Sequence, residues 1–194
     1  MSPRTVRLPT PTPHRVESYI RRFDKEEDGV ERALSKLFRL FPENTVLEDV
    51  LLKVVTLNGL YHTGIFATHD VAKHILWLKI DPLLKEGQSK AIDRIARVRL
   101  GKNTRHNFSF YSFATKYCSW HNQGAYPIYD SRVNAILWRY RKQDQFAEFQ
   151  RQALWEYDEF KRVITTFRTH YKLEGFDFKA LDKFLWLASQ DYCD

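Results

Sequence analysis

Residues 108–132 read FSFYSFATKYCSWHNQGAYPIYDSR, a stretch that places one lysine, Lys116, and one carboxylate, Asp130, among aromatic side chains. The wider window of residues 91–142 carries ten Lys or Arg side chains against two acids, a local charge of +8 in a chain whose net charge is +7. A basic surface of this kind is typical of proteins that bind polyanions. One amine and one acid inside such a surface indicate an enzyme that acts on nucleic acid.

Apolar residues recur at helical spacing from Val16 onward, as in Val30, Leu34 and Leu37. Strict two-residue alternation is nearly absent, so the sequence predicts an all-α protein with eight or nine helices. At 194 residues and 43% hydrophobic content, the chain can bury a sizeable core. We expect one domain over residues 15–194 and a flexible Pro-rich tail over residues 1–14.

Capping residues predict where the helices begin. Asn44 and Thr45, with Glu48, resemble a capping box ahead of an apolar run that ends at Tyr61. Residues 145–172 form either one long helix or two helices broken near Gln152. The other predicted helices cover residues 70–78, 91–99, 131–141 and 178–189, behind the caps Thr68, Ser89, Asp130 and Asp177.

The two cysteines, Cys118 and Cys193, provide no disulfide framework and no four-cysteine zinc site. Cys118 and His121 share a helix face, but a structural zinc needs four ligands and no second pair follows, so we expect no metal and no cofactor. No apolar run reaches the roughly 18 to 20 residues of a membrane span. We therefore expect a cytoplasmic or nucleoid-associated protein that binds no membrane, with a monomer as the default state.

Two segments resemble the helix-hairpin-helix (HhH-GPD) DNA glycosylase superfamily, and most closely its 8-oxoguanine branch. Residues 110–116, FYSFATK, resemble the hairpin with its nucleophilic lysine, and residues 128–132, IYDSR, resemble the approach to the catalytic aspartate. Upstream, residues 57–63 and 71–75 resemble the early helix whose end lines the base pocket. The resemblance covers residues 45–142 and the C-terminal helices, which in the superfamily fold back on the N-terminal ones. It implies a two-lobed helical fold with a cleft between the lobes.

The resemblance implies a glycosylase with lyase activity that flips a damaged base, such as an oxidised purine, out of double-stranded DNA. Lys116 matches the nucleophile that attacks C1′, and Asp130 matches the carboxylate that stabilises positive charge on the sugar. The implied walls of the base pocket are Tyr61, His62, Trp120 and Tyr129. The implied contacts to the DNA backbone are Arg99, Lys102, Arg105, Thr115 and Arg132.

The sequence departs from the superfamily where Phe113 and Ala114 replace the hairpin glycines, and only 14 positions separate Lys116 from Asp130. Phosphate anchoring is then expected to shift to Thr115 and the basic side chains. Other interpretations remain open. Asp130 is also a good helix N-cap, and Lys116 is also readable as a solvated lysine. A helical nucleic-acid-binding module without chemistry is the main alternative function, and a protein-interaction domain is a third.

Overall fold

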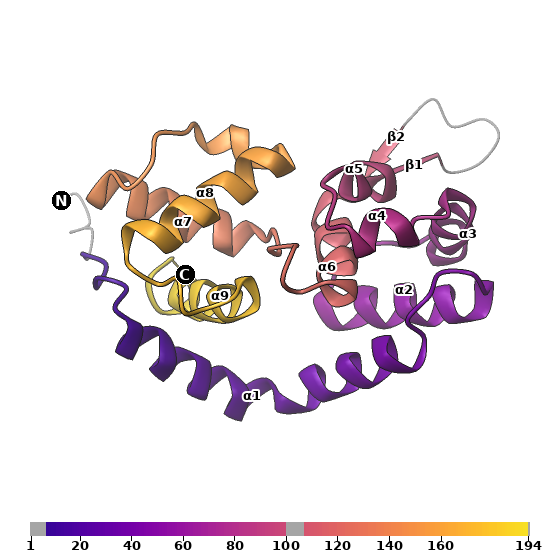
Figure 1. Cartoon of the computed structure of the whole chain (residues 1–194), viewed down its shortest axis with the longest axis horizontal. Helices are drawn as coiled ribbons and strands as arrows, with labels where there is room; N and C mark the ends of the chain where they lie inside the picture. The colour runs from indigo at the N-terminus through magenta and orange to yellow at the C-terminus, as the bar shows by residue number, and fades with distance from the viewer. Residues whose placement is uncertain (1–6, 100–106, 194) are drawn as a thin grey trace. The chain divides into compact units, whose positions relative to one another are not determined.

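The computed structural model describes residues 7–99 and 107–193, which form nine α-helices, one 3-10 helix and one two-stranded hairpin (Figure 1). The all-α prediction is confirmed. None of the helices in these two ranges is both long enough and apolar enough to span a bilayer. The elements are α1 (Pro13–Leu40), α2 (Leu47–Tyr61), α3 (Thr68–Leu78), α4 (Asp81–Lys85), α5 (Lys90–Ala96), β1 (Arg97–Arg99), β2 (Asn107–Ser109), α6 (Tyr111–His121), α7 (Ser131–Asp144), η1 (Arg151–Trp155), α8 (Tyr157–His170) and α9 (Phe178–Cys193).

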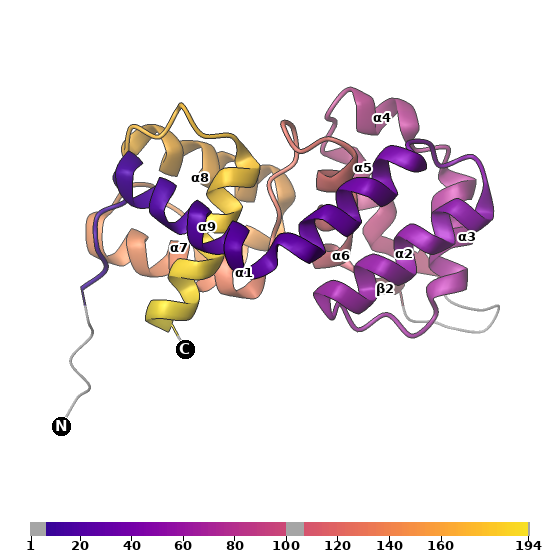
Figure 2. The ribbon, with the colours of Figure 1, turned by 90° about the horizontal axis from the view of Figure 1, so that it is seen from below.

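The chain divides into two compact units. The central unit is the continuous segment Glu27–Ile128, and the terminal unit combines Met1–Glu26 with Tyr129–Asp194. Helix α1 contributes its first half to the terminal unit and its second half to the central unit (Figures 1 and 2). The terminal unit is therefore assembled from both ends of the sequence.

In the terminal unit, α7 packs against α9, and the first half of α1 is joined to α9 by polar contacts. The Asp191 carboxylate accepts hydrogen bonds from the Tyr19 hydroxyl at 2.8 Å and from the Arg22 guanidinium at 2.9 Å. Beneath them lies an apolar core that uses every element of the unit. Its fully buried members include Val16, Leu137, Val163, Phe167, Leu181 and Phe184.

The N-terminal segment is more ordered than the sequence predicted. Leu8 is buried, and its backbone exchanges two hydrogen bonds with the Gln143 side chain, at 2.7 and 3.0 Å. Helix α1 begins at Pro13, where the missing N–H and fixed φ of proline suit a first turn. The expectation of a tail over residues 1–14 is thus wrong from Leu8 onward, because an apolar side chain and an amide partner anchor it. Residues 1–6 lie outside the described ranges.

In the central unit, α2 packs on α3, and α5 and α2 pack on α6 (Figure 1). The α2–α3 connection is held by Asn58, whose side chain accepts from the Ile65 N–H at 2.9 Å and from the Thr63 hydroxyl at 2.8 Å. Asn58 also donates to the Ile65 carbonyl at 2.9 Å. One amide side chain therefore satisfies both backbone polar groups of Ile65 in a connection that has no regular ladder.

Several predicted boundaries need correction. The capping box fails because the N-cap of α2 is Val46, without a side-chain cap, while Asn44 is buried elsewhere. The helix expected over residues 91–99 ends at Ala96, and Arg97–Arg99 instead pairs antiparallel with Asn107–Ser109. Val98 is buried in that short strand. The open choice over residues 145–172 resolves as two helices, η1 and α8.

Candidate functional site

Lys116 lies in the middle of α6 in the central unit, and only 2% of its surface is exposed. Its amine donates to the Ser112 hydroxyl at 2.7 Å and lies 5.4 Å from the centre of the Tyr61 ring. The segment expected to form a hairpin around this lysine is instead the first turn of α6. Phe113 and Ala114 replace the two hairpin glycines of the superfamily, and neither residue can reverse the chain as a glycine could. The interpretation of Lys116 as a solvated lysine is therefore wrong, because its amine is buried and lies against an aromatic ring.

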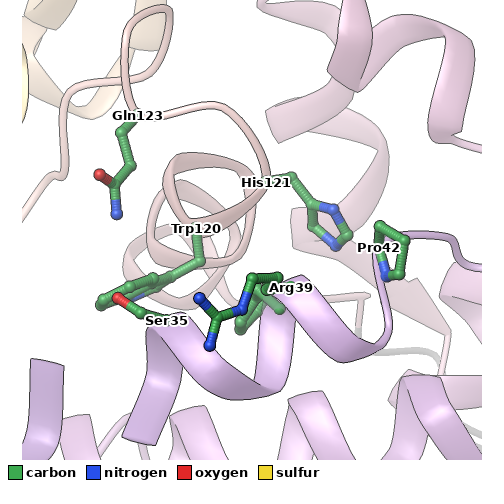
Figure 3. Close-up of a pocket in the computed structure, with 7 residues that line it drawn as sticks. Ser35, Arg39, Pro42, Trp120, His121 and Gln123 are labelled. Carbon is green, nitrogen blue, oxygen red and sulfur yellow. The ribbon is translucent and has the colours of Figure 1, made fainter. Parts of the chain in front are cut away.

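Tyr61 and Trp120, two of the expected pocket walls, lie in the same place. The Trp120 indole N–H donates to the Tyr61 hydroxyl at 3.1 Å, and its ring stacks on Phe38 with centres 6.0 Å apart. Trp120 also lines a pocket of about 290 Å³ between α1 and α6 (Figure 3). The pocket is lined by Ser35, Phe38, Arg39, Pro42, Trp120, His121 and Gln123. His62, by contrast, is the exposed C-cap of α2, with a left-handed φ of 49°.

Beside this pocket lies a buried polar network that the sequence did not reveal. The Lys53 amine is fully buried and donates to the carbonyls of Phe41 and Glu43, at 3.1 and 2.8 Å, and to the Asn44 Oδ1 at 2.7 Å. Asn44 in turn donates to the Asp81 carboxylate through its side chain at 2.5 Å and its backbone at 3.0 Å. The Tyr117 hydroxyl, deep in α6, also donates to Asn44 Oδ1. Each buried polar group therefore has a partner, as a buried cation requires.

His121 is the last member of the network, and its neighbours determine the protonation state of its ring. Its Nε2 lies 3.5 Å from the Lys53 amine and 3.4 Å from the Asn44 amide nitrogen, and both of these groups are donors. Nε2 must therefore accept, which requires a neutral ring that donates from Nδ1. Burial and the Lys53 charge lower the pKa of His121 to about 3. Burial lowers the pKa of Lys53 to about 8, partly offset by the charges of Asp81 and Asp49.

A sequence signal for Lys53 existed. Lys53 occupies the apolar phase of α2, in line with Val50, Val54 and Leu57, all of which are buried. A lysine at such a position must find several acceptors or lose its charge. The sequence could not show which groups stabilise the charge of Lys53, because the Phe41 and Glu43 carbonyls and the Asp81 carboxylate lie outside α2.

Asp130 and Tyr129 belong to the terminal unit. Asp130 is the N-cap of α7, and its carboxylate accepts from the Arg132 N–H at 2.9 Å. Capping by Asp130 is therefore confirmed, as is capping by Asp177, which accepts from the Ala180 N–H at 2.8 Å. Tyr129 is buried, and its hydroxyl accepts from the Asn134 amide at 3.2 Å. Burial raises the pKa of this phenol.

The structure describes only two of the five side chains that were expected to contact the DNA backbone, Thr115 and Arg132. Thr115 is fully buried, and its hydroxyl donates to the Ser112 carbonyl at 2.9 Å, so the prediction that it grips phosphate is wrong. Helical spacing places it on the inner face of α6, where a hydroxyl bonds its own helix. Arg132 is half-buried, with its guanidinium 5.8 Å from the Trp186 ring centre. Lys102, Arg105 and the Arg99 side chain lie outside the described part of the chain. Within that part, no group of three His, Cys, Asp or Glu side chains is placed to hold a metal ion.

Comparison with known proteins identifies the family of this chain. A family model described as the HI_0787_N N-terminal domain matches residues 15–125, more than half of the chain. The chain belongs to the HI_0787_N family. It is also 41% identical over 150 residues to an uncharacterized protein of Haemophilus influenzae, across 77% of this chain and 70% of the relative. No solved structure matches the chain significantly.

The HI_0787_N match ends three residues before the central unit ends at Ile128. It therefore spans Lys116, the Tyr61–Trp120 pair and the whole network around Lys53. Asp130 and Tyr129 follow it in sequence. The family thus covers the amine of the expected chemistry, while the carboxylate stands just outside the matched residues.

Proposed function

We propose that this HI_0787_N protein is a DNA glycosylase with lyase activity, in which Lys116 is the nucleophile and Asp130 the electrostatic partner. The observation that carries the proposal is the state of Lys116. Its amine is buried beside the Tyr61 ring and is held by the Ser112 hydroxyl at 2.7 Å, as a positioned nucleophile would be. Oxidised purines in double-stranded DNA are the substrate class that the sequence resemblance favours.

The chemistry follows from what each group can do. The Lys116 nitrogen attacks C1′ as the bond from C1′ to the base breaks, and the base leaves with that electron pair and gains a proton. The amine loses its proton and the sugar ring opens, which leaves a Schiff base that permits β-elimination of the 3′ phosphate. The Asp130 carboxylate, held at the start of α7, stabilises the developing positive charge on the sugar. The proposal requires both groups to reach the same sugar in the complex with DNA.

The order of the chain offers further support. A two-lobed glycosylase fold has C-terminal helices that fold back on the N-terminal ones, and the terminal unit here combines Met1–Glu26 with Tyr129–Asp194. Lys116 lies in the continuous unit and Asp130 in the discontinuous one.

Release of a damaged base from duplex DNA tests the proposal. Wild-type protein is expected to release 8-oxoguanine or a related oxidised purine, and Asp130→Asn is expected to lose this activity. Asn is as good an N-cap as Asp, so this variant removes the charge and keeps the cap. If Asp130→Asn retains full activity, the carboxylate is a cap only. If no damaged duplex in a broad panel loses a base, the catalytic proposal fails.

The second candidate is a nucleic-acid-binding module without chemistry. The burial of Thr115 and the capping role of Asp130 favour it, because each side chain then has a structural use. Such a module is expected to bind DNA with an affinity that falls steeply with salt, by a slope set by the phosphates it neutralises. It releases no base from any duplex, which separates it from the enzyme.

A further inference from the structure

A second pocket lies in the terminal unit, at the start of α7. Its volume is about 260 Å³, and only the terminal unit contributes to it. Aromatic, amide, hydroxyl and guanidinium groups share the lining, which is a mixture suited to a planar polar ligand. The lining residues are Tyr129, Ser131, Asn134, Arg151, Gln152 and Trp155.

Trp155 provides the aromatic surface. Its side chain is 60% exposed although it lines a pocket, and its ring centre lies 5.3 Å from that of Tyr129. Tyr129 is itself buried and packs edge-on against Phe160 at 5.4 Å. A single exposed tryptophan needs no explanation on its own. Here the indole lies against a buried phenol ring, tilted 47° to it, and this contact limits its motion before a second ring stacks on it.

Arg151 provides a positioned positive charge. Its Nε donates to the Asn134 Oδ1 at 2.8 Å, and the Asn134 amide donates to the Tyr129 hydroxyl at 3.2 Å. Asn134 is only 4% exposed, so a buried amide orients an exposed guanidinium. The same chain of bonds also ties the guanidinium to the phenol that supports Trp155. A guanidinium keeps its charge at any physiological pH and suits phosphate oxygens.

Two acids lie next to this pocket in sequence, and neither lines it. Asp130 precedes Ser131 and caps α7, where its carboxylate accepts from the Arg132 N–H at 2.9 Å. Glu156 follows Trp155 and is exposed at the start of α8. Ser131 and Gln152 add exposed polar groups beside Arg151. The pocket therefore joins an aromatic platform to one oriented cation and neutral hydrogen-bonding groups.

We propose that this pocket binds one unpaired nucleotide, with the base stacked on Trp155 and the phosphate on Arg151. A base inside a duplex has both faces covered by its neighbours, so only a base outside the stack can lie on an indole. The same chemistry is presented by a nucleotide in a single strand and by a free nucleoside monophosphate. The pocket contains Tyr129, an expected wall of the base pocket, but Trp155 and Arg151, which would hold the nucleotide, lie outside the expected catalytic set.

Binding of a fluorescein-labelled single-stranded oligonucleotide, measured by anisotropy, tests the proposal. Trp155→Ala is expected to weaken binding by between about fivefold and a hundredfold, the range for losing one stacked base. Arg151→Gln is expected to weaken binding and to lower the salt slope by about one. Trp77→Ala is the matched control, since Trp77 is 77% exposed on α3 of the central unit.

A competition arm separates the two sources of the nucleotide. Displacement of the oligonucleotide by adenosine monophosphate, lost in Trp155→Ala, assigns the pocket to free nucleotides as well. Displacement by unlabelled strand alone assigns it to nucleic acid. Unchanged affinity in both Trp155→Ala and Arg151→Gln, with circular dichroism showing folded protein, overturns the proposal. An equal loss in Trp77→Ala overturns it as well.

The glycosylase proposal is judged by another readout. Lys116→Gln is expected to abolish base release and to leave single-strand binding through Trp155 unchanged. Conversely, Trp155→Ala is expected to weaken single-strand binding and still permit base release at saturating protein. If one of the two proposals fails, the other can therefore still be tested.

Discussion

The neutral state of His121 makes the stability of the central unit depend on pH. In the folded chain the pKa of His121 is lowered to about 3 by burial and the nearby Lys53 charge. An unfolded histidine titrates near about 6.5. Between these two values the unfolded chain binds a proton that the folded chain refuses, so stability is lost as the pH falls. Integrated from pH 7.5 to 5, this one group removes about 2 kcal/mol of the free energy of unfolding.

His121→Gln tests this reasoning through urea unfolding at several pH values. The variant is expected to be less stable at pH 7.5, because the ring contacts with Phe38 at 4.9 Å and Tyr117 at 5.1 Å are lost. Its stability is expected to fall by about 2 kcal/mol less than that of the wild type on the way to pH 5. His69→Gln, at an exposed position, is the control and keeps the wild-type pH dependence. Parallel curves for wild type and His121→Gln would refute the assignment of a neutral, buried ring.

Three further substitutions test the structure by urea unfolding. Asn44→Leu is expected to cost about 3 to 5 kcal/mol, because Lys53 and Asp81 both lose a partner; a cost below 1 kcal/mol contradicts the network. Asn58→Ala is expected to cost about 1 to 3 kcal/mol and to speed hydrogen exchange of the Ile65 amide, because the Asn58 Oδ1 accepts from that amide at 2.9 Å. Unchanged exchange contradicts this role of Asn58. Asp130→Ala is expected to cost about 1 kcal/mol and Asp130→Asn almost nothing, and equal costs contradict the cap.

Helix periodicity could predict the helical class and most helix positions. The predicted run to Tyr61 and the helix that starts at Ser131 both match, because apolar spacing and an Asp N-cap are local signals. The β1–β2 hairpin escaped prediction because three-residue strands are too short for alternation to register. The burial of Leu8 escaped because its partner, Gln143, comes from the other end of the chain.

The candidate site divides in a similar way. The sequence resemblance chose Lys116, Tyr61 and Trp120, and the structure brings these three together in the central unit. Asn44 was misjudged as part of a capping box, since Asn serves equally well at caps and in buried networks. Only the fold brings it to Lys53 and Asp81. Residue type predicts what a side chain can do, and tertiary contacts decide which of those uses it has.

Borohydride trapping shows whether Lys116 forms a covalent bond with the sugar. Wild-type protein is mixed with a duplex that carries an oxidised purine or an abasic site, reduced with borohydride, and digested for peptide mapping. We predict a covalent adduct on the peptide that contains Lys116, its loss in Lys116→Gln, and its persistence in Lys36→Gln, an exposed lysine of the same unit. An adduct on the Lys53 peptide, an adduct that survives Lys116→Gln, or no adduct with any duplex would contradict the claim that Lys116 is the nucleophile.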